Sequence, residues 1–253
     1  MKTTSVESVL AKVPEATLGF WLVKIAATTL GETAGDAVSM SLHLGYLAAT
    51  GIFAVFFAAL VFAQMRATRF HPILYWSTII ATTTVGTTLA DFADRSLGIG
   101  YAGGSSLLLA LLGASLLLWQ RSTGSVAVGS VQSGKAEVFY WVTIMFSQTL
   151  GTALGDWSAD TAGLGYQGAA VLFGSALAVV ALLYWRTAAS RTALFWAAFI
   201  LTRPLGAVLG DFLDKPIASG GLELSRFAAS AVLLAGMVIA LRLLPQRAAA
   251  VAH

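Results

Sequence analysis

Residues 20–46 read FWLVKIAATTLGETAGDAVSMSLHLGY, and the pattern within this stretch returns three more times along the chain. Each copy begins with an aromatic residue followed by a tryptophan. A glycine stands ten residues after that tryptophan, and an aspartate stands fifteen residues after it. Recurrence of this kind without gaps is the signature of a repeated structural unit. The four aspartates are Asp36, Asp91, Asp156 and Asp211.

Each copy is long enough to form two helices joined by a short turn. Copies one and three, and copies two and four, are each 120 residues apart, which indicates duplication of a hairpin and then of the pair. Because each unit has an even number of spans, all four units are expected to enter a membrane from the same side. Apolar stretches of about 20 residues, the length that crosses a bilayer, are expected at 19–40, 46–65, 74–93, 101–120, 138–159, 165–185, 192–213 and 222–243.

The composition favours a protein solvated by lipid. Hydrophobic residues make up 57% of the 253 residues and charged residues 11%, whereas a soluble domain carries roughly 25% charged residues. Cysteine is absent, which excludes disulfides and thiolate metal sites. The sequence predicts an all-α polytopic membrane protein of about eight transmembrane helices, built from four parallel two-helix repeats around a pseudo-fourfold centre. The expected parts are an N-terminal segment 1–18, a single transmembrane domain 19–243 with repeats 19–66, 74–120, 138–186 and 192–243, and a tail 244–253.

Basic residues predict the orientation. Those between the hairpins and at the chain ends outnumber those on the opposite side, where Arg95, Lys215 and Arg226 stand among acidic residues. This asymmetry places both termini in the cytoplasm. The tryptophan of each repeat is then expected at the inner interface as an aromatic anchor. The basic residues on the inner side are Lys2, Lys12, Arg66, Arg69, Arg121, Lys135, Arg186, Arg191, Arg242 and Arg247.

One face of the first helix in each unit is polar. Positions 3, 7, 11 and 15 after the tryptophan lie along this face, whereas the second helices are almost wholly apolar. A polar stripe in lipid must face protein or water, so the four stripes are expected to meet at a common centre. Glycine pairs of the G-x-x-x-G kind allow the helices to approach closely. The polar members are Lys24, Thr28, Glu32, Asp36, Thr83, Thr87, Asp91, Gln148, Thr152, Asp156, Arg203 and Asp211.

The acidic members of this face are the candidate metal ligands. Five carboxylates face two bases, Lys24 and Arg203, which leaves three carboxylates without a cation. An unpaired carboxylate cluster takes up protons or binds a metal ion. The predicted ligands are Glu32, Asp36, Asp91, Asp156 and Asp211. The path is expected to continue inward along Thr28, Thr83, Thr87, Gln148 and Thr152.

Three structural interpretations of the aspartates stay open. They can lie at helix ends exposed to outer water, they can bond to threonine hydroxyls such as those of Thr87 and Thr152, or they can be neutralised by Lys24 and Arg203. A further acidic set stands about one turn beyond the ring. It fits either a solvated outer rim or a funnel that concentrates cations. This outer set consists of Asp94, Asp160 and Asp214.

Two bases on the polar face fit a gate or a counter-charge. Arg203 precedes Pro204, which frees a backbone carbonyl and can kink the helix. The alternative for Arg203 is a fixed salt bridge to Glu32 or to an aspartate. For Lys24 the alternative is that its ammonium reaches the inner interface, as lysines near helix ends do.

The first copy contains a run that resembles a known family. The run is KIAATTLGETAGD from Lys24 to Asp36, followed by LGY at 44–46. It resembles a bacterial family of internally repeated, multi-pass proteins described as membrane-anchored and of unassigned function. The resemblance extends over the four repeats and implies a bacterial inner-membrane location. It implies no substrate.

We therefore expect a cation transporter or channel with a central carboxylate-lined site. The donors are hard oxygen atoms, which suit Mn²⁺, Mg²⁺, Ca²⁺ or protons. The expected partners are the lipid bilayer and a metal ion or proton, with no nucleic acid and no resident cofactor. A catalytic motif is not found, so an enzyme is not expected. The alternative is a non-catalytic membrane scaffold or sensor whose polar centre only fixes helix register.

Overall fold

A computed structural model describes residues 11–132 and 134–249, and these residues form eight α-helices with no β-strand. The all-α prediction and the four two-helix repeats are confirmed. Residues 1–10 of the predicted N-terminal segment and residues 250–253 of the predicted tail lie outside the described residues. The helices are α1 (Leu18–Asp36), α2 (Tyr46–Arg66), α3 (Pro72–Asp91), α4 (Tyr101–Thr123), α5 (Gly134–Asp156), α6 (Gly165–Arg186), α7 (Arg191–Asp214) and α8 (Arg226–Leu243).

Three of the four odd helices change pitch directly after the repeat aspartate. Five-residue π-helical turns follow Asp36, Asp91 and Asp156, whereas α7 continues past Asp211 as an α-helix to Asp214. A loop at 215–225 then leads to α8, so that helix begins four residues later than predicted. Inserted π turns occur often at functional sites. The turns are η1 (Ala37–Ser41), η2 (Phe92–Ser96) and η4 (Trp157–Thr161).

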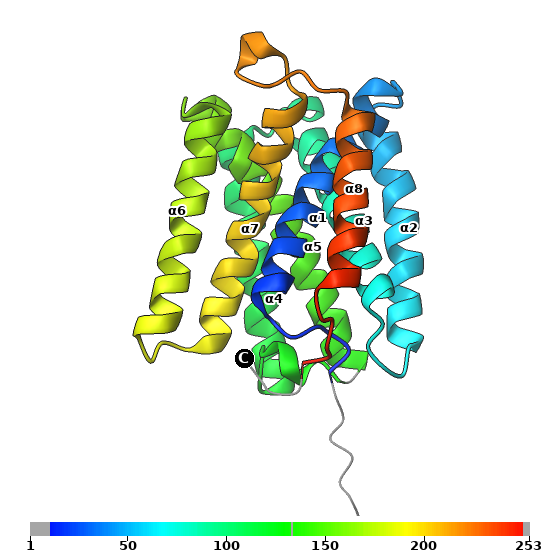
Figure 1. The fold of residues 1–253 in the computed structure, drawn as a ribbon, viewed down its shortest axis with the longest axis vertical. Helices are drawn as coiled ribbons and strands as arrows, with labels where there is room; N and C mark the ends of the chain where they lie inside the picture. The colour runs from blue at the N-terminus through cyan, green and yellow to red at the C-terminus, as the bar shows by residue number, and fades with distance from the viewer. Residues whose placement is uncertain (1–10, 133, 250–253) are drawn as a thin grey trace, which may run out of the picture.

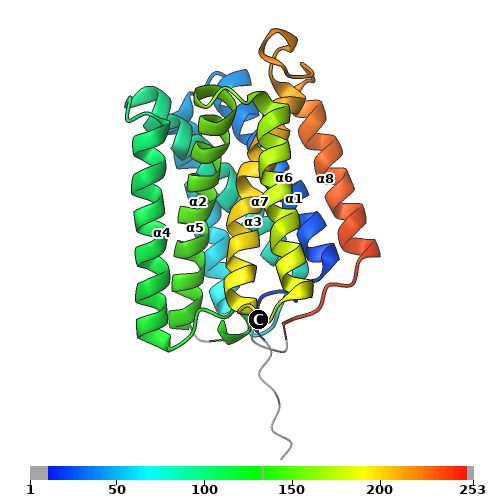
Figure 2. The same cartoon turned by 90° about the vertical axis from the view of Figure 1, so that its left-hand side faces the viewer.

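The odd helices form a closed ring inside the bundle. α1 packs against α3 and α7, and α5 packs against the same two helices. Figures 1 and 2 show these four helices surrounded by the even ones. The predicted glycine contacts are present, because the space where each glycine lacks a Cβ is taken by the next repeat. The pairs are Gly31 with Thr83, Gly86 with Gln148, Gly151 with Arg203, and Gly206 with Thr28.

Each even helix packs on the odd helix of the following repeat. α2 lies on α3, α4 on α5, α6 on α7, and α8 closes the circle on α1. Large apolar side chains remain exposed on the outer faces, among them Val55, Leu109, Val171 and Val232. By length and composition, five helices in the described part of the chain could cross a membrane: α2, α4, α6, α7 and α8.

Eight aromatic rings close one end of the ring of odd helices, and we call them the aromatic collar. The ring that precedes each repeat tryptophan contacts the tryptophan of the next repeat, with centroid distances of 5.4, 5.9, 6.3 and 5.6 Å. Trp76, Trp141 and Trp196 are at most 4% exposed. The prediction that these three are interface anchors is therefore wrong, because cyclic packing buries them. The collar consists of Phe20, Trp21, Tyr75, Trp76, Tyr140, Trp141, Phe195 and Trp196.

Both described chain ends lie at this collar end, which is the lower end in Figure 1. The repeat aspartates lie at the other end, where the odd helices finish, and we call it the aspartate end.

Candidate functional site

The four repeat aspartates are all buried, with at most 3% of each residue exposed. Two of them share one lysine. The ammonium Nζ of Lys215 lies 2.5 Å from Asp36 Oδ2 and 3.0 Å from Asp211 Oδ1. Lys215 comes directly after α7, so it reaches an aspartate of its own repeat and the aspartate of repeat one.

The other two aspartates share one arginine. Arg95 Nε lies 2.9 Å from Asp91 Oδ1, and Arg95 Nη2 lies 3.4 Å from Asp156 Oδ2. Arg95 and Lys215 both stand nineteen residues after the tryptophan of their repeats. The two bases therefore occupy equivalent positions in repeats two and four, and each joins its own repeat to the next.

These shared carboxylates keep both bases charged. Burial lowers the pKa of Lys215, but the negative charges of Asp211 and Asp36 outweigh that effect, so its pKa is raised overall. Burial likewise opposes the charged form of Arg95, and Asp91 and Asp156 raise its pKa above the ordinary value. Each base thus lies between two carboxylates that favour its charged form.

The predicted outer rim divides into three different environments. Asp214 is buried, and its Oδ2 lies 2.9 Å from Nε of Arg226, which also lies 3.9 Å from Asp36 Oδ2. Asp94 is buried beside Gly104 of α4 and makes no hydrogen bond or ion pair with the described residues. Asp160 is exposed. A solvated rim therefore describes Asp160 but neither of the other two.

The predicted charge balance needs correction. It opposed Lys24 and Arg203 to the carboxylates, whereas Arg95, Lys215 and Arg226 fold back from the aspartate end onto the ring. Sequence reasoning missed these three bases. The available signal was the four-residue spacing from Asp91 to Arg95 and from Asp211 to Lys215, a distance at which helical side chains meet. At the aspartate end, six buried carboxylates now face three bases: Asp36, Asp91, Asp94, Asp156, Asp211 and Asp214 against Arg95, Lys215 and Arg226.

A fully buried arginine fills the centre of the bundle. Arg203 Nη1 and Nη2 each donate to Glu32 Oε2 at 2.9 Å. Nη2 also donates to Thr87 Oγ1 at 2.7 Å and to Thr152 Oγ1. The arginine of repeat four thereby contacts one residue from each of the other three repeats. The salt bridge to Glu32, one of the two predicted roles of Arg203, is present in the structure.

The residues of the predicted polar path are buried along the inner faces of the helices, but most of their hydroxyl groups already form hydrogen bonds within the protein. Thr28 Oγ1 donates to Ile25 O at 2.9 Å and to Thr202 O at 3.2 Å, so this hydroxyl bonds to its own helix and to α7. Thr83 Oγ1 donates to Ile80 O at 2.8 Å. Gln148 differs, because both amide atoms are buried without a hydrogen-bond partner. Gln148 therefore keeps both polar groups of its amide unused within the described structure.

Lys24 does not reach the inner interface, so that expectation is wrong. The side chain is 0% exposed, because the aromatic collar lies between it and the chain ends. Its Nζ lies 3.3 Å from Thr202 Oγ1 and 4.0 Å from the centroid of the Phe199 ring. A cation held over an aromatic face gains electrostatic stabilisation, and Lys24 has no carboxylate partner among the described residues.

Three carboxylates could hold a metal ion. One oxygen each from Asp36, Asp211 and Asp214 lies within 4.8 Å of the others. The Oδ1 atoms of all three are buried without a hydrogen-bond donor, although Asp211 Oδ1 has the charge contact with Lys215 at 3.0 Å. Carboxylate oxygens suit hard cations. A metal ion at this point would compete with the Lys215 ammonium for the same oxygens.

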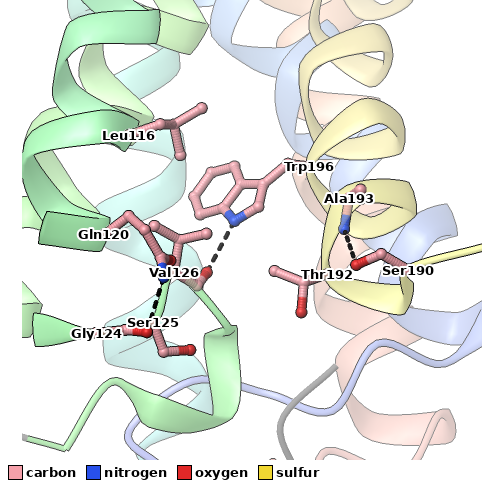
Figure 3. A pocket seen from close by; sticks show the side chains of 9 residues that line it. All are labelled: Leu116, Gln120, Gly124, Ser125, Val126, Ser190, Thr192, Ala193 and Trp196. Atoms are coloured by element: carbon pink, nitrogen blue, oxygen red, sulfur yellow. Dashed lines mark hydrogen bonds between the residues drawn. The ribbon is translucent and has the colours of Figure 1, made fainter.

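Two pockets in the described part of the chain lie elsewhere. A cavity of about 420 Å³ opens at the collar end between the end of α4 and the start of α7. Figure 3 shows Trp196 reaching from α7 toward Val126, where Nε1 donates to Val126 O at 2.9 Å, and Ser190 capping α7 through the amide of Ala193. A second, wholly apolar cavity of about 310 Å³ lies between α2 and α5. Neither is lined by a residue of the charged network.

Comparison with known proteins yields one family. The model of a family described as a repeat of unknown function (DUF347) matches the chain four times, at residues 19–70, 74–125, 139–190 and 194–246. These matches coincide with the predicted repeats and confirm the resemblance to an internally repeated family of unassigned function. No curated protein and no solved structure matches the chain. Function must therefore be argued from the geometry.

Proposed function

We propose, for a chain that belongs to the DUF347 family of repeats of unknown function, that its eight helices form a transmembrane carrier for a small hard cation. The cargo is a divalent metal ion of the Mn²⁺, Mg²⁺ or Ca²⁺ kind, or a proton. The location is the bacterial inner membrane with both termini in the cytoplasm.

The distribution of side chains supports the membrane location. Apolar residues are exposed around the outer even helices, and five helices have the length and composition of a span. α1, α3 and α5 belong to the inner ring, where their polar faces meet protein rather than lipid. A buried polar face of this kind is what a helix in a bilayer requires.

The observation that carries the proposal is the charge imbalance at the aspartate end. Six buried carboxylates face three bases, so the cluster holds an excess of negative charge if all groups are ionised. Ionised carboxylates that share a buried site destabilise one another. Binding of a proton or a hard cation relieves this repulsion, so the cluster has a physical reason to attract such a cargo.

Asp36, Asp211 and Asp214 supply the best site for that cargo. Their oxygens already converge, and Lys215 holds two of them from the loop that follows α7. The ammonium of lysine is a compact charge on a flexible stem. Its withdrawal into that loop would free the carboxylates for an incoming cation, whose positive charge would take the place of the ammonium.

The collar end favours a carrier over an open channel. Beyond the aromatic collar, the next layer of the ring consists of Ile79, Ile144, Phe199 and Lys24, all with 0% exposure. Three apolar side chains and a fully buried lysine fill this layer and oppose passage of a hydrated cation. Access to the polar centre is therefore from the aspartate end, and release at the other end requires a conformational change.

Flux through reconstituted liposomes tests the proposal. Mn²⁺ entry is followed by quenching of an entrapped dye and proton entry by an entrapped pH indicator, in wild type, Asp36→Asn and Asp211→Asn. We expect wild-type flux above that of protein-free liposomes and a loss of about tenfold or more in each variant, equivalent to about 1.4 kcal/mol of binding. Asp160→Asn is the matched control, because Asp160 is exposed, and it should retain wild-type flux.

The same assay distinguishes the alternative, a non-catalytic membrane scaffold or sensor. Arg203 favours that alternative, since its bonds to Glu32, Thr87 and Thr152 fix helix register without needing a cargo. A scaffold predicts no flux of either ion from folded wild-type protein, and equal behaviour of all three variants. That result would overturn the carrier.

A further inference from the structure

Three short segments lie together across the aromatic collar, and we call them the end plate. They are residues 11–17 before α1, residues 126–132 between α4 and α5, and residues 244–249 after α8. The first and last pair antiparallel through Ala249 N to Val13 O at 2.9 Å and Glu15 N to Arg247 O at 2.9 Å. The middle segment joins them through Lys12 N to Val131 O at 3.4 Å.

The end plate packs directly on the collar. Ala11, Val13, Val128, Val131 and Ala249 are at most 2% exposed and belong to one hydrophobic cluster with the collar rings. Two collar tryptophans are also tied to the plate by hydrogen bonds. Trp76 Nε1 donates to Gln246 Oε1 at 3.0 Å, and Trp196 Nε1 donates to Val126 O at 2.9 Å (Figure 3). The plate therefore covers the collar and holds two of its rings in position.

One ion pair fastens the plate to the helices. Lys12 Nζ lies 2.7 Å from Glu137 Oε1 at the start of α5 and donates to Met65 O at the end of α2, at 3.2 Å. The Glu137 side chain is 3% exposed and that of Lys12 is 16% exposed. A largely desolvated charge pair is costly to break. Lys12 thus joins the plate to two helices of different repeats.

We propose that the end plate is a gate at the collar end, with the Lys12–Glu137 pair as its latch. The plate consists of short segments joined by few backbone hydrogen bonds, so loss of the Lys12–Glu137 pair leaves apolar contacts and two tryptophan hydrogen bonds to hold it on the collar. Its release uncovers the collar without unfolding a helix. The role of this opening in cargo release rests on the proposed carrier, whereas the opening itself does not.

The absence of cysteine allows a direct test. A single Val23→Cys reporter, at a buried position of the collar cluster, is labelled with a water-soluble maleimide in otherwise wild-type protein and in Lys12→Met. We expect labelling to accelerate by about tenfold in Lys12→Met, with faster amide hydrogen exchange in residues 244–249. Lys135→Met is the matched control, since Lys135 is an exposed lysine at the same end.

Each outcome decides the point. Unchanged labelling and exchange in folded Lys12→Met protein, or equal acceleration in Lys135→Met, would overturn the gate. If Lys12→Met does not purify as folded protein, Glu137→Gln preserves shape and makes the same test. Accelerated labelling without any ion flux in the liposome assay would leave the gate standing and reject the carrier, so the two failures are distinguishable.

Discussion

Repeats two and four carry the same arrangement at the aspartate end, yet one is held by an arginine and the other by a lysine. The positions correspond with an offset of 120 residues. Arginine presents a rigid fork that stays charged, whereas lysine is a single flexible point charge. The duplicated units thus keep a basic residue at the same position, but this residue is an arginine in one unit and a lysine in the other. The arginine half-site is Asp91, Asp94, Arg95 and Asp156, and the lysine half-site is Asp211, Asp214, Lys215 and Asp36.

The third carboxylate of each half-site also differs. Asp214 converges with Asp36 and Asp211 and is bonded to Arg226. Asp94 lies beside Gly104 of α4 instead, without an ion pair among the described residues. Position 106, which stands 120 residues before Arg226, is a serine. Under the proposed carrier, the lysine half-site would be the one that exchanges cations and the arginine half-site would be its structural counterpart.

The largest effect is expected at Arg203, the central arginine that contacts the other three repeats. Glu32→Gln leaves the buried Arg203 guanidinium without its counter-charge. Removing one partner of a buried pair costs about 3–5 kcal/mol, so we expect a loss of unfolding free energy of that size, measured by denaturant unfolding in detergent. The double variant Glu32→Gln/Arg203→Met should recover much of the loss. A cost near zero for Glu32→Gln would show that the hydroxyls of Thr87 and Thr152 suffice.

The next largest effect is expected on Mn²⁺ affinity, which should differ between variants of the lysine half-site and the arginine half-site. Lys215→Met removes the cation that competes for Asp36 and Asp211, whereas Arg95→Met opens a half-site whose carboxylates do not converge within the described structure. We expect Mn²⁺ affinity, measured by titration calorimetry on purified protein, to rise by about tenfold or more in Lys215→Met only. An equal rise in both variants would remove the distinction between the half-sites.

The helix layout could be predicted from the sequence, because the repeat alignment averages four independent observations of one unit. The spans expected at 46–65 and 165–185 match α2 and α6 within one residue. The exchange of partners, in which α2 packs on α3 rather than on α1, could not be predicted. Apolar even helices carry no signal that distinguishes one neighbour from another, since their exposed and packed faces have the same composition.

The site was predictable only in part. A buried Asp36 with three equivalents follows from the polar stripe, and so does the central position of Arg203. The bases at 95 and 215 were assigned to loops, because their four-residue spacing from Asp91 and Asp211 was not interpreted as a continuation of the helix. The tryptophans were misplaced for a related reason. A tryptophan near the start of a helix is compatible with a membrane interface as well as with a buried position. Only the cyclic packing of the four repeats buries these tryptophans.

The smallest effects are expected at Asp94 and Asp214, which stand 120 residues apart at equivalent positions. Substitution of the two should change the free energy of unfolding in opposite directions. Asp94→Asn removes a charge from a buried carboxylate that has no hydrogen-bond donor, so we expect an increase in unfolding free energy of about 0.5–1 kcal/mol. Asp214→Asn removes the partner of Arg226, whose side chain is 22% exposed, and should cost about 1 kcal/mol. Both values come from the same denaturant titrations, with Asp160→Asn as the neutral reference. If both substitutions change the free energy of unfolding in the same direction, the two half-sites have similar environments. The stability data would then not support cation exchange at the lysine half-site in particular.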